Sequence, residues 1–179
     1  MKAGIYQVLG TVERVSEAGP LLRQPGDCVI VERGGVRRSL LMQCPCGCGE
    51  LLPVNLDPRA GKAWRLYDRY GFWTLFPSID RDTGCHSHFI LSRGRIIWCD
   101  WDNPADTTDY SGFLETLRAY FNGRNFTNFF TAAEDLDLVP WDVSTACHIL
   151  VGLGDLEEGR GRQRGSFRPR SQSTHSDTV

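Results

Sequence analysis

The chain has 179 residues, of which 41% are hydrophobic and 23% are charged, and its net charge is −2. These values are close to those of ordinary globular proteins, so we expect one domain with its own core and a small appendage. The near-neutral charge excludes a global electrostatic attraction to nucleic acid or to an anionic membrane.

The N-terminal segment, MKAGIYQVLGTVERV, contains no long apolar run, so the sequence predicts no signal peptide. No segment approaches the roughly 18 consecutive apolar residues of a membrane span. We therefore expect a cytoplasmic protein of bacterial type. In a reducing cytoplasm, clustered cysteines are more often metal ligands or catalytic groups than disulfides. The odd total of seven cysteines also argues against a purely disulfide framework.

Residues 1–103 are predicted to form a β domain. Two hairpins are expected, one turning at Gly34-Gly35 between segments rich in β-branched residues and one turning at Arg93-Gly94. The remaining short strands are expected at 51–56, 63–70 and 72–79, with one or two edge strands within 5–15. This pattern predicts a compact antiparallel sandwich or small barrel that holds a zinc site.

Residues 104–154 are predicted to form a small helical extension, which makes the whole chain α+β and mainly β. Apolar residues recur at helical spacing in 109–121, and a short second helix is expected at 127–136. The third helix, 140–154, has Asp142 as its predicted N-cap and Gly152 or Gly154 at its end.

The tail, residues 155–179, has almost no apolar residues and is predicted to be disordered. Its arginines are Arg160, Arg162, Arg164, Arg168 and Arg170. One interpretation is a solvated terminus. The other is a weak electrostatic contact with RNA, DNA or an acidic partner.

Two cysteine-containing segments, about forty residues apart, predict a metal site. The first, QCPCGCGE at 43–50, supplies Cys44, Cys46 and Cys48, and the second, GCHSHF at 84–89, supplies Cys85 and His88 in C-x-x-H spacing. Two short groups of ligands on separate loops form a four-coordinate site, and thiolate and imidazole ligands favour Zn²⁺.

The spacing leaves the exact ligand set open. Cys85 and His88 are the predicted ligands of the second segment, because C-x-x-H spacing favours His88 over His86. Two or three of the first segment's cysteines complete the set. A remaining thiol lies beside the metal, or becomes a fourth sulfur ligand if His88 does not bind.

Other interpretations remain open at this point. The three clustered cysteines could be core residues or a metal-free disulfide switch, and Cys85 with His88 matches half of a Rieske-like iron–sulfur centre. A zinc hydrolase, such as a peptidase or deconjugase, would need an open metal position and a carboxylate base. The candidate bases are the acidic residues near the two segments, Glu50, Asp80, Asp82, Asp100, Asp102, Asp106 and Asp109. No H-E-x-x-H, Walker, Rossmann or G-x-S-x-G motif is present. The sequence therefore favours a structural metal site in a binding or adaptor protein.

Three further cysteines, Cys28, Cys99 and Cys147, lie in apolar segments away from the two clusters. We expect each to be a small buried hydrophobic residue rather than a ligand.

Three blocks, CPCGCGELLPVNL, TLFPSI and CHSHFILSRGRIIW, occur in this order within residues 25–100. They resemble a bacterial family known as domain of unknown function 6527. The resemblance implies a metal site made of the three clustered cysteines, Cys85 and His88, with Pro77-Ser78 and Trp98 as framework. Some members of that family are encoded beside ubiquitin-like conjugation genes. The resemblance therefore implies an accessory factor with protein partners in a bacterial ubiquitin-like modification or defence system.

Overall fold

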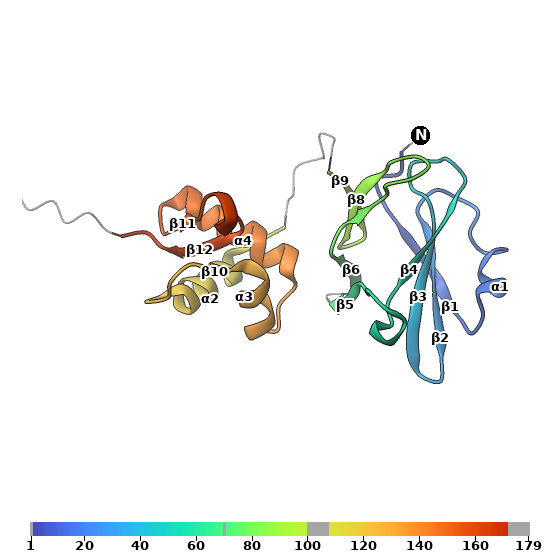
Figure 1. Cartoon of the computed structure of the whole chain (residues 1–179), viewed down its shortest axis with the longest axis horizontal. Helices are drawn as coiled ribbons and strands as arrows, with labels where there is room; N and C mark the ends of the chain where they lie inside the picture. Colours follow the sequence, from blue (N-terminus) through green and yellow to red (C-terminus); the bar gives the residue numbers. More distant parts are fainter. Residues whose placement is uncertain (1, 70, 100–107, 172–179) are drawn as a thin grey trace, which may run out of the picture. The chain divides into compact units, whose positions relative to one another are not determined.

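The computed structural model describes residues 2–69, 71–99 and 108–171 (Figure 1). The chain divides into two compact units, Met1–Ala105 and Asp106–Val179, called unit 1 and unit 2 below. The predicted boundary at residue 103 lies outside the described residues and stays a prediction.

Unit 1 is built from strands with two short helical turns. In chain order its elements are β1 (Gln7–Val12), α1 (Val15–Ala18), β2 (Asp27–Arg33), β3 (Val36–Gln43), β4 (Leu51–Asn55), η1 (Pro58–Ala60), β5 (Arg65–Arg69), β6 (Phe72–Phe76), β7 (Ile79–Asp80), β8 (His88–Ser92) and β9 (Arg95–Trp98).

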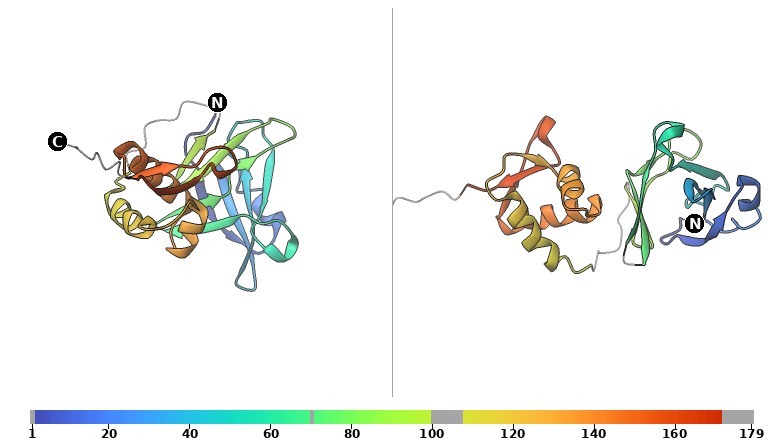
Figure 2. Two further views of the ribbon diagram at one scale, coloured as in Figure 1. Left: turned by 60° about the vertical axis from the view of Figure 1, so that its left-hand side comes forward. Right: turned by 90° about the horizontal axis from the view of Figure 1, so that it is seen from below.

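The strands of unit 1 form three sheets, in the orders β1-β2-β3-β4, β5-β6 and β7-β8-β9 (Figures 1 and 2). The expected hairpins at Gly34-Gly35 and Arg93-Gly94 are confirmed as β2-β3 and β8-β9. The pairs of unit 1 are antiparallel as expected, except that β1 pairs parallel with β2. The segment between these strands includes α1 and is long enough to carry the chain back to the same end of the sheet, as a parallel pair requires.

Strand β2 lies at the centre of unit 1 and is buried on both faces. Cys28 and Ile30 pack into the main core with Phe89 of β8. Val29 and Val31 point to the opposite face and pack in a smaller cluster beneath α1. Because successive side chains of a strand alternate between its faces, this continuous apolar run supplies both clusters.

Unit 2 combines three helices with a small sheet. Its elements are α2 (Ser111–Phe121), β10 (Thr127–Asn128), α3 (Phe129–Asp135), α4 (Pro140–Leu153), β11 (Leu156–Glu158), η2 (Gly161–Gln163) and β12 (Ser166–Pro169). The predicted helices are confirmed, and so is a mainly β fold followed by a helical part. Gly154 ends α4 in the left-handed conformation, at φ 86°, but Asp142 lies buried inside the first turn and is not the N-cap.

The predicted disorder of the tail is wrong for residues 156–169. There β11 and β12 pair antiparallel, and β12 also pairs with β10. The aromatic ring of Phe167 is fully buried in the core of unit 2 and anchors β12. Residues 172–179 lie outside the described part of the chain.

Within the described ranges no single helix is long and apolar enough to cross a membrane. Helices α3 and α4 meet these criteria only when taken together, as a pair bent by 119°.

Candidate functional site

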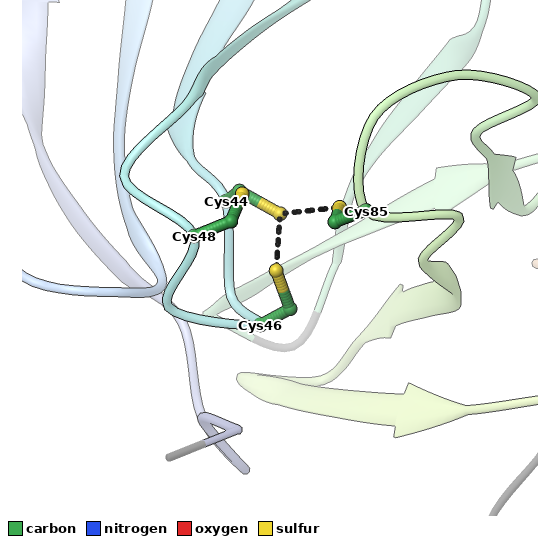
Figure 3. Close-up of side chains that lie close together, drawn as sticks. All are labelled: Cys44, Cys46, Cys48 and Cys85. Carbon is green, nitrogen blue, oxygen red and sulfur yellow. Dashed lines mark hydrogen bonds between the residues drawn. The ribbon is translucent and has the colours of Figure 1, made fainter.

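Four cysteine sulfurs meet between two loops of unit 1 (Figure 3). The loop from β3 to β4 carries Cys44, Cys46 and Cys48, and the loop from β7 to β8 carries Cys85. All four sulfurs lie within 4.8 Å of one another. The Sγ of Cys44 is 3.3 Å from that of Cys46 and 3.6 Å from that of Cys85. Sulfurs placed about 2.3 Å from a tetrahedral zinc ion are about 3.8 Å apart, so this donor set fits a single metal ion.

The first loop folds back on itself and directs its sulfurs inward. The amide of Gly47 donates to the carbonyl of Cys44 at 3.1 Å, and the amide of Cys44 donates to the carbonyl of Glu50 at 2.8 Å. Gly47 and Gly49 have φ angles of 86° and 84°, which side chains with a Cβ rarely adopt. The glycines that separate the cysteines therefore allow the tight curl of the loop.

Arg81 joins the second loop to the first. Its Nη1 donates to the Sγ of Cys85 at 3.1 Å and also forms an ion pair with the carboxylate of Glu50. Its backbone amide donates to the carbonyl of Ser87 at 3.1 Å, which closes the second loop. A Cβ at Gly84 would lie 2.9 Å from a carboxylate oxygen of Glu50, so the close approach of the two loops favours glycine there.

The thiols of the cluster differ in their readiness to ionise. Burial raises the pKa of Cys44 to about 12, with a further contribution from its sulfur neighbours. Burial also opposes ionisation of Cys85, but hydrogen bonds from Ser87, Cys46 and Cys44 outweigh it and lower the pKa of Cys85 to about 6. A bound cation would favour the thiolate form of all four cysteines, because metals bind the thiolate.

His88 does not belong to the cysteine cluster and lies against a serine instead. Its Nε2 is 3.1 Å from the Oγ of Ser78, the residue that directly precedes β7. The indole Nε1 of Trp64 donates to the carbonyl of Ser78 at 3.2 Å, which fixes the serine backbone. Asp80 lies opposite His88 in the β7-β8 register, but no ion pair joins them in the part of the chain that the structure describes. The arrangement is therefore a serine–histidine pair.

The structure thus divides the predicted site residues into two groups. Cys44, Cys46, Cys48 and Cys85 are together, whereas His88 is bonded to Ser78 and His86 is exposed at a φ of 51°. No local motif marks Ser78 as reactive, because its surroundings, FPSID, lack the glycines of a G-x-S-x-G turn. The pair forms only when β7 and β8 come together.

The three other cysteines have different environments. Cys28 and Cys147 are fully buried, as predicted, and burial raises the pKa of each to about 12. Cys99 is exposed, so the prediction of a buried thiol is wrong there. It follows Trp98 at the end of β9, where the strand leaves the core.

One protein family matches part of the chain. Residues 15–99 match the model of a family described as the bacterial ubiquitination-like system serine protease (BubE). The matched segment contains the cysteine cluster, Ser78 and His88, and it links the chain to bacterial ubiquitination-like systems. Searches of curated proteins and of solved structures found no match.

Proposed function

We propose that this protein is a serine peptidase of a bacterial ubiquitination-like system, with Ser78 as nucleophile and His88 as general base. The observation that carries the proposal is the hydrogen bond of 3.1 Å between Ser78 Oγ and His88 Nε2. The matching family is described as a serine protease, and both residues lie within the matched segment. The thiol-rich site is consistent with a cytoplasmic protein, because cytoplasmic thiols stay reduced.

The pair provides the two groups that acyl transfer requires. A serine hydroxyl is a weak nucleophile until an adjacent base accepts its proton. As Ser78 Oγ attacks the carbonyl carbon of the scissile bond, His88 Nε2 takes the hydroxyl proton. The tetrahedral intermediate then breaks the bond to the leaving group, which receives the proton from His88, and an acyl ester remains on Ser78. Water activated by His88 hydrolyses this ester and restores both residues.

The cysteine cluster has a structural role in this proposal. We infer that Cys44, Cys46, Cys48 and Cys85 hold Zn²⁺, since four thiolates form a closed tetrahedral site without a position for substrate. A two-iron cluster divides its ligands between two metal atoms, whereas these four sulfurs all lie within 4.8 Å of one another. Cys85 belongs to the loop that leads into β8, so a metal bound there would fix the start of the strand that carries His88.

A second candidate function is that of a zinc-stabilised adaptor without catalytic activity. It is favoured by the four-thiolate donor set, which is typical of structural zinc sites in binding modules. The same experiment separates the two functions, because an adaptor needs no reactive serine.

The test is covalent labelling of the full chain, purified with its metal, by a fluorophosphonate probe that reacts with activated serines. Peptide mass spectrometry is expected to locate the label on Ser78. Ser78→Ala should abolish labelling, and His88→Gln should slow it roughly 10²–10⁴-fold through loss of the general base. Ser16→Ala, at an exposed position of α1, serves as the matched control and should label normally.

Metal content measured on the same variants distinguishes a base from a ligand. If His88 acts on Ser78, His88→Gln retains the metal of the parent protein by elemental analysis. Loss of metal in His88→Gln would instead assign His88 to the metal shell. A metal-containing, folded protein whose Ser78 never reacts would support the adaptor.

A further inference from the structure

Unit 2 contains a helix-turn-helix followed by a β-hairpin. Residues 136–139 separate α3 from α4, and the two helices are bent by 119° relative to each other. Two helices at roughly 90–120° joined by a short turn define the helix-turn-helix motif. Directly after α4, β11 and β12 form a hairpin, and β12 pairs with β10 to give the sheet order β10-β12-β11. This succession of helices and strands is that of a winged helix, in which the hairpin is the wing.

The hairpin is firmly attached to the helices of unit 2. Phe167 of β12 is fully buried and makes an edge-on contact with Phe121 of α2, at 6.4 Å between ring centroids. At the base of the loop, the amide of Gly159 donates to the carbonyl of Ser166 at 2.9 Å, and the amide of Gly165 donates to Glu158 Oε1 at 2.8 Å. The two ends of the loop of residues 159–165 are therefore bonded to the strands of a hairpin that is anchored in the core of unit 2.

This loop carries three arginines and no acidic residue. Arg160, Arg162 and Arg164 are exposed, and none of them forms an ion pair with any residue in the described ranges. The two acidic residues of β11 are already engaged: Glu157 pairs with Arg168, and Glu158 accepts from Gly165 and lies 3.5 Å from His148. The tip of the hairpin therefore presents a concentrated positive charge.

We propose that the loop of residues 159–165 contacts the phosphate backbone of duplex DNA. Guanidinium groups bind phosphate through paired hydrogen bonds and keep their charge at all physiological pH values. In helix-turn-helix proteins the second helix lies at the major groove, and neighbouring segments contact the flanking backbone. The hairpin directly after α4 is in position for such a contact. This inference is independent of the peptidase proposal and concerns a different unit.

The composition of α4 indicates that the protein contacts the DNA phosphate backbone and does not recognise bases. The helix PWDVSTACHILVGL has no lysine or arginine, and acidic residues lie at the end of α3, Glu134 and Asp135, and in the turn, Asp137. Base recognition in the major groove relies largely on arginine, lysine, asparagine and glutamine, none of which α4 supplies. Binding should therefore be weak, insensitive to sequence and dependent on salt.

The test is fluorescence anisotropy of the full chain with a labelled duplex DNA of about 20 base pairs at 50–200 mM NaCl. Three arginine–phosphate contacts predict a slope of about −2.7 for log K against log salt, which is about a 40-fold loss of affinity over this range. The variant R160Q/R162Q/R164Q should lose this salt-dependent binding. The control R23Q/R33Q/K62Q removes the same charge at exposed positions of unit 1 and should bind like the parent protein.

Four outcomes would overturn the proposal. The first is no binding to the duplex at 50 mM NaCl and about 10⁻⁴ M protein, the weak end of non-specific affinities. The second is an equal loss of DNA affinity in both triple variants, which would indicate that only the net charge of the chain matters. The third is loop-dependent binding of polyglutamate without binding of DNA, which would identify an acidic protein as the partner. The fourth is a preference for duplex RNA, whose narrow major groove does not admit a helix.

Discussion

At the scale of single residues, Arg81 connects the four-cysteine cluster with the surrounding protein. Four thiolates around a divalent ion leave a net charge of about −2 on the site. The Arg81 guanidinium lies 3.1 Å from Cys85 Sγ and also pairs with Glu50, so it holds both loops and would offset part of this charge once a metal is bound. Groups of this kind, which bond to the ligands rather than to the metal, orient the ligands and tune the affinity of the site.

Arg81→Gln should therefore lower the affinity for Zn²⁺ roughly 10–100-fold, the usual effect of removing a group that bonds to a ligand. The measurement is competition between the protein and a chromogenic chelator. Arg37→Gln is the matched control, because Arg37 pairs with Asp68 on the same unit at 3.3 Å and does not contact the cysteines. Equal Zn²⁺ affinities for the parent protein, Arg81→Gln and Arg37→Gln would show that Arg81 has no part in metal binding.

At the scale of secondary-structure elements, the β11-β12 hairpin shows how one side chain can order a polar segment. Residues 155–171 contain few apolar side chains, yet Phe167 is fully buried among the rings and aliphatic side chains of unit 2. It is in T-shaped contact with Phe121 and with the imidazole of His148. The backbone pairing of β12 with both β10 and β11 then satisfies the peptide groups of the segment.

Phe167→Ala should destabilise unit 2 by about 3–5 kcal/mol, since it removes a large side chain from a closed core. The hairpin should then become the first site of proteolysis in unit 2. Chemical denaturation followed by limited proteolysis measures both effects. Phe72→Ala, at a half-exposed position of β6, is the control for loss of an aromatic side chain. A Phe167→Ala protein with parental stability and an uncut hairpin would contradict this account.

At the scale of the whole molecule, the chain consists of two compact units with separate cores. The thiol cluster lies entirely in unit 1, whose core includes Cys44. Structural zinc contributes roughly 10–16 kcal/mol of apparent binding free energy, which is as large as the stability of a whole domain, about 5–15 kcal/mol. Metal removal should therefore destabilise or unfold unit 1 and leave unit 2 folded.

Calorimetry of the full chain is expected to show two unfolding transitions. A chelator should lower the midpoint temperature of the unit 1 transition, or abolish that transition, and leave the unit 2 transition unchanged. Tryptophan fluorescence assigns the transitions, because the described tryptophans Trp64, Trp73 and Trp98 belong to unit 1 and Trp141 belongs to unit 2. Phe167→Ala provides the opposite control, since it should lower the midpoint temperature of the unit 2 transition only. A single transition that moves as a whole on chelation would show that the two units unfold together.

The sequence alone determined the features that depend on local chemistry. The Gly34-Gly35 and Arg93-Gly94 turns marked their hairpins because few residues other than glycine adopt positive φ angles. Helical spacing of apolar residues located α2 and α4, and the spacing of Cys44, Cys46 and Cys48 indicated a metal-binding loop. These signals lie within a few residues of one another, so they could be read without the fold.

The tertiary structure decided what depends on contacts between distant segments. Ser78 and His88 carry no shared local signal and meet only because β7 pairs with β8, which directs the imidazole to a serine and away from the four thiols. Phe167 is one aromatic residue in an arginine-rich stretch, and only the cavity formed by the helices of unit 2 gives it a core to enter. Local composition predicts how a segment behaves in water, whereas burial and pairing with remote strands determine whether it folds and which side chains can react together.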